Sequence, residues 1–109
     1  MMQSPLQPDA ADLIAARFRA LADPTRLRIL DQLRRREELS VGELTEALGT
    51  SQQNVSKHLG ALRAEGFVSR RKRGTSSLYR IADPSVFDLC DRLCDAMESQ
   101  LAALGSVLA

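Results

Sequence analysis

The chain has few aromatic residues: one Tyr, three Phe and no Trp in 109 residues. Its core must therefore be built from Leu, Ile, Val and Ala. No apolar run approaches the roughly 18 residues that a membrane-spanning helix needs. Met1 to Gln7 also lack the basic start and the apolar stretch of a signal peptide. We therefore expect a cytoplasmic protein with no membrane partner.

Histidine and cysteine are scarce as well, with one His and two Cys. A single His leaves no material for a catalytic triad or a multi-His metal centre, and there is no glycine-rich loop that could cradle a phosphate. Cys90 and Cys94 form C-x-x-x-C, which differs from the C-x-x-C of thiol oxidoreductases. These absences predict that the chain is not an enzyme.

The length and composition fit one globular domain, with 44% hydrophobic and 27% charged residues. We expect a flexible tail over residues 1–8, a folded domain over 9–105 and a short tail over 106–109. The net charge is only +1, but it is unevenly distributed. Seven cations and one anion lie between Ser51 and Ile81, which gives this segment +6 and leaves −5 for the remainder. The sequence thus predicts a basic surface on an acidic body, although a solvated charged face would show the same pattern.

Apolar spacing and capping residues predict four helices, a β-hairpin and a last helix. A first helix begins at Asp9, and Asp23-Pro24 starts a second, because Asp is a good N-cap and Pro fits the first helical position. Ser40 to Glu43 forms a capping box for a third helix that ends at Gly49. The remaining elements are a fourth helix capped by Thr50 or Ser51 and closed by Gly66, strands over 67–71 and 77–81, and a last helix opened by Asp83-Pro84 and reaching roughly Leu104.

The third and fourth predicted helices are joined by Leu48 to Ser51, a tight turn of the kind found in helix-turn-helix units. If Val55, Leu59 and Leu62 face the core, the start of the fourth helix turns polar side chains outward. Such side chains can read base edges in the major groove and bind phosphates. The predicted contacts are Ser51, Gln52, Gln53, Asn54, Ser56 and Lys57. His58, beside them, is either a phosphate contact or a packed polar group.

Four consecutive cations, Arg70, Arg71, Lys72 and Arg73, follow at the tip of the hairpin. We expect them to contact phosphates or the minor groove and so to add affinity more than sequence preference. Because side chains alternate along a strand, some of the four should point away from the duplex.

Three segments in order resemble the ArsR/SmtB family of metal- and metalloid-responsive repressors: Leu21 to Leu30 (LADPTRLRIL), Glu38 to Leu44 (ELSVGEL) and Ser51 to Leu59 (SQQNVSKHL). The resemblance extends over residues 12 to 98. It implies a winged helix-turn-helix fold, and a homodimer that pairs through the first and last helices. It also implies binding to an inverted-repeat operator in double-stranded DNA, from which an effector releases the repressor.

The family's effector sites fit this chain poorly. Where one site has a cysteine motif on the third helix, this chain has Ser40, whose hydroxyl cannot replace a thiolate. A second site uses Asp and His ligands on the last helix. Asp88 matches its first ligand, but Cys90 and Leu101 stand at the two His positions.

Cys90 and Cys94 remain as candidate effector residues, one helical turn apart in an apolar stripe that should face a partner subunit. Paired thiols from two subunits would suit zinc, cadmium or arsenite, or could act as a redox switch. Two small side chains that only fill space between the two subunits would give the same sequence pattern. The sequence therefore predicts a DNA-binding repressor with a thiol or metal effector. The alternatives are a repressor without an effector and a winged-helix module that binds proteins.

Overall fold

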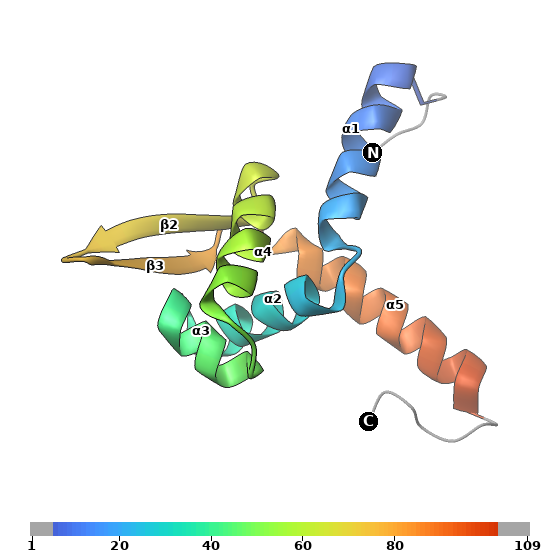
Figure 1. Ribbon diagram of the computed structural model, residues 1–109. Coiled ribbons are helices and arrows are strands. Elements are labelled where there is room, and N and C mark those ends of the chain that lie inside the picture. The colour runs from blue at the N-terminus through green and yellow to red at the C-terminus, as the bar shows by residue number, and fades with distance from the viewer. Residues whose placement is uncertain (1–5, 103–109) are drawn as a thin grey trace.

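The computed structural model describes residues 6–102, which form five helices and three strands (Figure 1). The order is α1 (Pro8–Leu21), α2 (Pro24–Arg36), β1 (Glu38–Ser40), α3 (Val41–Leu48), α4 (Gln52–Ala64), β2 (Val68–Arg73), β3 (Ser76–Ile81) and α5 (Ser85–Leu101). The predicted order of four helices, a hairpin and a last helix is confirmed. Residues 1–5 and 103–109, including Leu104 and the predicted C-terminal tail, lie outside the described residues. No helix in the described part is long and apolar enough to cross a membrane.

Three of the helix starts are capped as the sequence predicts. The Asp23 carboxylate accepts hydrogen bonds from the amides of Thr25 and Arg26, at 2.8 and 3.1 Å. Ser40 and Glu43 form the reciprocal capping box of α3. At α4 the cap is Ser51, whose hydroxyl accepts from the Asn54 amide at 3.1 Å. Each cap satisfies amides that the first turn leaves without a partner.

The predicted start of the last helix is wrong by one residue. α5 begins at Ser85 instead of Pro84, and it has no side-chain N-cap. The Asp83 carboxylate instead closes a short turn, accepting from the Ser85 amide at 3.0 Å and the Ser85 hydroxyl at 2.6 Å. The hydrogen bond from the Ser85 hydroxyl, and after it the one from the Ser85 amide, hold the pKa of Asp83 below its usual value.

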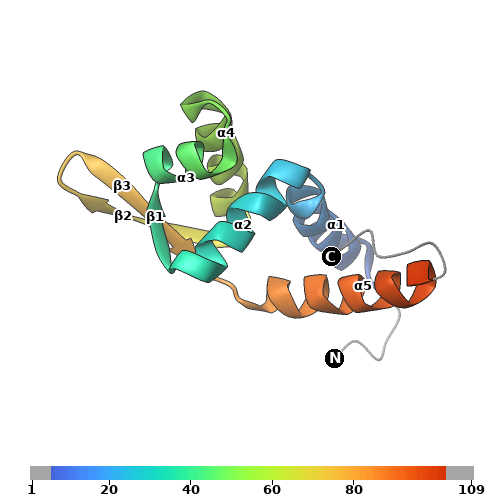
Figure 2. The ribbon, with the colours of Figure 1, turned by 90° about the horizontal axis from the view of Figure 1, so that it is seen from below.

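The hairpin belongs to a three-stranded antiparallel sheet in the order β1-β3-β2, and β1 was not predicted (Figure 2). β1 pairs Glu38 with Arg80 and Ser40 with Leu78, and the central Leu39 is buried. This strand has only three residues, too few to show an alternating pattern in the sequence. Its pairing brings the start of α3 against the hairpin.

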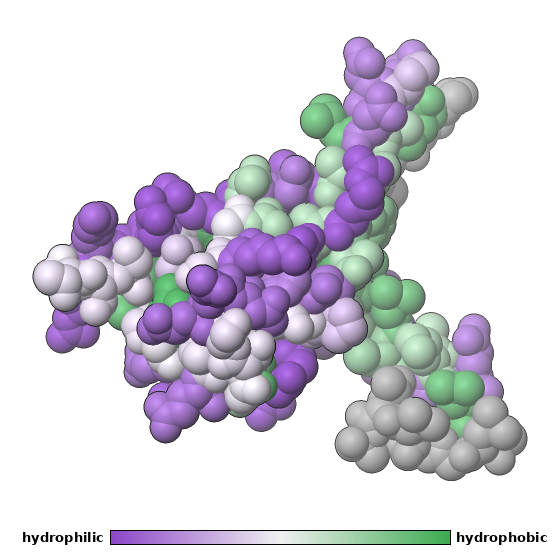
Figure 3. All heavy atoms as spheres, in the orientation of Figure 1, coloured by the Kyte–Doolittle hydropathy of each residue, from purple (hydrophilic) through white to green (hydrophobic). Residues whose placement is uncertain are grey.

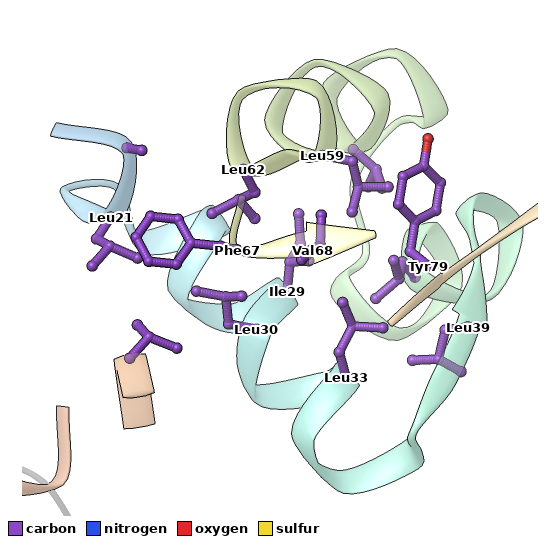
Figure 4. Packing of buried hydrophobic residues seen from close by; sticks show 14 of the residues in the cluster. Leu21, Ile29, Leu30, Leu33, Leu39, Leu59, Leu62, Phe67, Val68 and Tyr79 are labelled. Carbon is purple, nitrogen blue, oxygen red and sulfur yellow. The ribbon is translucent and has the colours of Figure 1, made fainter. Parts of the chain in front are cut away.

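The core lies between α2, α3, α4 and the sheet, and it is mainly aliphatic as expected (Figure 4). The largest fully buried side chains are Ile29, Leu30, Leu33, Leu39, Leu44, Val55, Leu59 and Leu62. Phe67 and Tyr79 are the buried aromatic residues within 6–102. Because Val55, Leu59 and Leu62 of α4 face this core, the polar face of that helix points away from it.

α1 and α5 project from this body on the side away from the hairpin (Figure 1). Leu13 and Phe18 of α1 are 69% and 52% exposed, and every residue from 91 to 100 of α5 is exposed. In Figure 3 patches of hydrophobic residues lie on α1 and α5 and where the two helices approach each other, beside hydrophilic residues of α1, while α3, α4 and the hairpin are mostly hydrophilic. Large exposed apolar surfaces of this kind mark sites of association.

Candidate nucleic-acid interface

The start of α4 presents a polar face to solvent, as the sequence predicts. Gln52, Gln53, Ser56 and Lys57 are exposed, while Val55, Leu59 and Leu62 on the opposite face are buried. The N-cap, Ser51, is also exposed. The structure thus brings six of the predicted contact residues, 51–54, 56 and 57, to one end of one helix. Asn54 is half-buried, and its side-chain amide donates to the Thr50 hydroxyl at 3.1 Å.

The turn before α4 depends on Gly49. This residue is the C-cap of α3 in the left-handed conformation, with φ of 67°, and its amide donates to the Thr45 carbonyl at 3.0 Å. Glycine adopts this conformation without steric cost. The turn sets the angle at which α4 follows α3, and so positions the exposed end of α4.

His58 does not share that exposed face. The residue is 6% exposed, and its Nδ1 accepts a hydrogen bond from Arg26 Nε at 3.0 Å. Arg26 Nη1 also donates to the Ala20 carbonyl at 3.2 Å. Little of the imidazole is left to meet a phosphate. Of the two roles expected for His58, its position fits the packed polar group.

The strand register divides the four hairpin cations between two faces of the sheet. Arg70 pairs with Tyr79 and Lys72 with Ser77, on the face that carries the core residues Val68 and Leu39. Arg71 and Arg73 lie on the opposite face, because neighbouring residues of a strand point in opposite directions.

Arg71 is also held by a carboxylate. Its Nε and Nη2 donate to the two oxygens of Glu38 at 2.7 and 2.8 Å. This bidentate pair lowers the pKa of Glu38 and raises that of Arg71. No local sequence pattern indicates the pairing, because the two residues are 33 positions apart and meet through β1.

A polar groove of about 450 Å³ runs between the start of α3, the start of α4 and the hairpin. Two predicted contact residues, Gln52 and Ser56, line one wall. The other walls were missed by the sequence reasoning, because they come together only when β1 pairs with β3. They consist of Ser40, Val41, Gly42, Thr75, Ser76, Ser77 and Tyr79.

Cys90 and Cys94 lie at the other end of the molecule, on α5. Cys90 is half-buried and packs against the core, whereas Cys94 is exposed. Burial, followed by the neighbouring Cys94 and Asp91, raises the pKa of the Cys90 thiol. Asp91 is itself held by Arg34 through two hydrogen bonds of 3.1 and 3.2 Å. Within residues 6–102, one protomer groups no three Cys, His, Asp or Glu side chains that could hold a metal ion.

Comparison with known proteins places the molecule among transcriptional regulators. A family described as a helix-turn-helix domain matches residues 21–71. The "probable mercury resistance operon repressor" of Streptomyces lividans is 47% identical over 78 residues, which are 72% of this chain and 62% of that protein. The aligned part thus spans less than two thirds of that relative.

Solved structures agree over nearly the whole fold. The Mycobacterium tuberculosis protein Rv0081 superposes with a TM-score of 0.78 at 34% identity, covering 93% of this chain and all of that one. A Mycobacterium bovis domain, Mb0332, is described as a homodimeric winged helix-turn-helix DNA-binding domain and a candidate ArsR-family regulator. It gives a TM-score of 0.76 at 33% identity, covering 93% of each chain.

Proposed function

We propose that this chain, which belongs to the ArsR/SmtB family of winged helix-turn-helix transcriptional regulators, represses transcription by binding duplex DNA as a homodimer. One observation carries the proposal: the exposed polar start of α4 and the cationic hairpin share a groove at one end of the molecule. A helix that presents Gln, Ser and Lys at its N-terminal end fits the major groove, and a basic hairpin fits the phosphates beside it.

The apolar surfaces of α1 and α5 at the opposite end support the dimer. A second copy packed there would cover Leu13, Phe18 and Leu93, which are 69%, 52% and 55% exposed in one protomer. A two-fold axis at this position would present two copies of α4 to half-sites about 34 to 36 Å apart along the DNA. This geometry predicts an inverted-repeat operator.

The test is binding to labelled duplexes, selected from a random pool, over a range of salt concentrations. Gln53→Ala should weaken binding to the selected sequence more than to random duplex, because a bidentate base contact is worth about 1 to 3 kcal/mol. Replacing both Arg70 and Lys72 by Ala should weaken binding to every duplex. The salt dependence should also flatten, by about one unit for each phosphate that the variant no longer neutralises.

Arg71→Ala with Arg73→Ala is the matched control, since it removes the same charge from the other sheet face. Equal weakening by the two double variants would contradict the division of the four hairpin cations between the two faces of the sheet. If the wild-type protein showed no salt-dependent binding to any duplex, the proposed function would be contradicted.

We also propose that Cys90 and Cys94 form the effector site, which takes a thiophilic ion such as arsenite, cadmium or zinc. Their spacing of one turn on α5, beside the expected dimer seam, supports this role. One protomer supplies two thiols, so a four-thiolate site needs the pair from the second subunit. The raised pKa of Cys90 keeps this thiol protonated until an ion binds the sulfur and displaces the proton.

Operator release by arsenite, cadmium, zinc or a persulfide donor tests this role. The Cys90→Ser, Cys94→Ser double variant should keep its DNA affinity and lose the response, which would be about 5- to 150-fold for an ordinary allosteric coupling. A double variant that keeps the wild-type response would show that the two thiols only pack. A wild-type protein that binds DNA and responds to none of these effectors would favour a repressor without a thiol effector.

A further inference from the structure

Tyr79 occupies an unusual position in the groove beside α4. The residue is 8% exposed, and its ring is part of the hydrophobic core. Figure 4 shows the ring among the core side chains with its oxygen at the end away from Leu33 and Leu39. Tyr79 nevertheless lines the polar groove. Because the ring is packed in the core, we assign the groove-lining part of the side chain to its hydroxyl end.

That hydroxyl has no hydrogen-bond partner among residues 6–102, although the described part of the chain contains no enclosed side-chain nitrogen or oxygen that lacks one. The hydroxyl oxygen is therefore not fully enclosed and is free to donate. A buried Tyr usually finds a partner for its hydroxyl. A packed ring also loses little conformational entropy when it binds, because its position is already fixed.

The rest of the groove suits an anion. None of the nine lining residues carries a charge, and Ser, Thr and Gln side chains supply further donors. The capping box uses the amides of Ser40 and Glu43, which leaves those of Val41 and Gly42 in the first turn of α3 without a partner inside the helix. The positive end of α3 therefore faces the groove. Glu43, the nearest acid in this turn, points its carboxylate back to the Ser40 amide.

Two cations adjoin this neutral groove. Arg70 and Lys72 are exposed, and the sheet register places them directly across from Tyr79 and Ser77 on the same face. Long cationic side chains can reach the same anion or the next one along a polyanion.

We infer that the groove between α3, α4 and the hairpin binds one phosphodiester of the DNA backbone, with the Tyr79 hydroxyl as a fixed donor to a phosphate oxygen. The inference rests on the proposed function and adds a residue and a ligand group to it. A rigid donor here fixes how far α4 enters the major groove, whereas the flexible wing cations supply attraction without a set position. Tyr79 is thus a positioning residue for the recognition helix.

Tyr79→Phe tests the inference, because it removes one oxygen and keeps the ring. The probes are duplexes of about 30 base pairs, one selected by the wild-type protein and one of random sequence. We expect about tenfold weaker binding to both, since a hydrogen bond to a charged group is removed. The salt dependence should stay unchanged, because a neutral donor releases no counterion. Ser69→Ala, which removes a hydroxyl from the other face of the same sheet, should bind as the wild type does.

A neutral methylphosphonate placed at each backbone position in turn identifies the phosphate. At one position it should weaken wild-type binding more than it weakens Tyr79→Phe binding. The inference would be overturned if Tyr79→Phe bound both duplexes as tightly as the wild type does, or if it bound only the selected duplex more weakly. In either case the proposed function would still stand. If the wild-type protein binds no duplex at all, the proposed function itself fails.

Gly42→Asp keeps the test independent of any loss of folding. A Cβ atom added at Gly42 would meet only the Ser40 hydroxyl, at 3.9 Å, and an acid in the first turn of a helix is favourable. The variant should therefore unfold at a temperature no lower than that of the wild type. It should nevertheless bind both duplexes at least about tenfold more weakly, because its carboxylate repels the phosphate. Ala82→Asp adds the same charge at an exposed position between β3 and α5, outside the groove and away from α4, and should cost less affinity. Equal affinities for the two Asp variants would also overturn the inference.

Discussion

At the scale of single residues, one guanidinium joins three helices. Arg26 of α2 donates to His58 of α4 and to the carbonyl of Ala20 near the end of α1. His58 is buried, and Asp23 Oδ1 lies 3.9 Å from its Nδ1. The helix expected to read DNA is thus tied to the helix expected to meet the second subunit. Because of this link, we expect a change of Arg26 to lower the stability of the fold.

Replacing Arg26 by Met should lower the free energy of unfolding by about 1 to 3 kcal/mol, because the buried His58 Nδ1 loses its donor. Urea unfolding followed by circular dichroism measures the change. Arg28→Met is the control, since Arg28 is exposed on the same helix and its replacement removes the same charge. Equal stabilities for the two variants would mean that the Arg26–His58 hydrogen bond contributes nothing measurable.

The residue scale also separates what sequence reasoning could predict from what it could not. Asp23, Ser40 and Ser51 bind amides two or three residues away, so their capping roles can be seen in short stretches of sequence. The Arg26–His58 and Arg71–Glu38 pairs join residues 32 and 33 positions apart. Such pairs depend on the tertiary fold, and the position of His58 could not be decided before the fold was known.

At the scale of elements, two glycines of the helix-turn-helix unit should respond to alanine in opposite directions. Gly49 has φ of 67° at the end of α3, where a side chain is strained even though space is open. Gly60 lies within α4, has ordinary helical geometry and has no atom within 4 Å of an added Cβ. The contrast isolates backbone conformation from packing.

We expect Gly49→Ala to destabilise the fold by about 1 to 2 kcal/mol, because L-residues pay that cost in the left-handed region. Gly60→Ala should stabilise it by about 0.5 to 1 kcal/mol through its higher helix propensity. Thermal and urea unfolding of both variants provide the measurement. A gain in stability from Gly49→Ala would show that this turn does not need the left-handed conformation.

The elements themselves were largely predictable because their signals are local. Apolar spacing located the helices, and the caps located most of their starts. β1 could not be predicted, because Glu38, Leu39 and Ser40 form a strand only by pairing with β3. The groove beside α4 was missed for the same reason, and Tyr79 with it. In the sequence Tyr79 is one more apolar residue of a strand, and nothing nearby shows where its hydroxyl ends.

At the scale of the whole molecule, apolar and polar surfaces lie at opposite ends. The hairpin and α4 hold the basic, polar end, while α1 and α5 hold the apolar one (Figures 1 and 3). Residues 91–100 of α5 are all exposed in one protomer, although Leu93 and Met97 lie on its apolar stripe. An isolated helix of this length is marginal in water. The outer half of α5 is thus expected to depend on a second copy.

Leu93→Glu combined with Met97→Glu should therefore give a monomer with a weaker helical signal and, as a result, little of the wild-type DNA affinity. Two carboxylates buried without partners in the seam would be too costly for association. Sedimentation at micromolar concentration should show the wild type as a dimer and the variant as a monomer. Binding to the selected duplex should fall because the two half-sites are no longer engaged by linked copies of α4. Arg92→Glu with Ser99→Glu also places two carboxylates on α5, one on each of two exposed positions off the apolar stripe. This control should remain dimeric, and a wild type that sediments as a stable monomer would contradict the role given to α5.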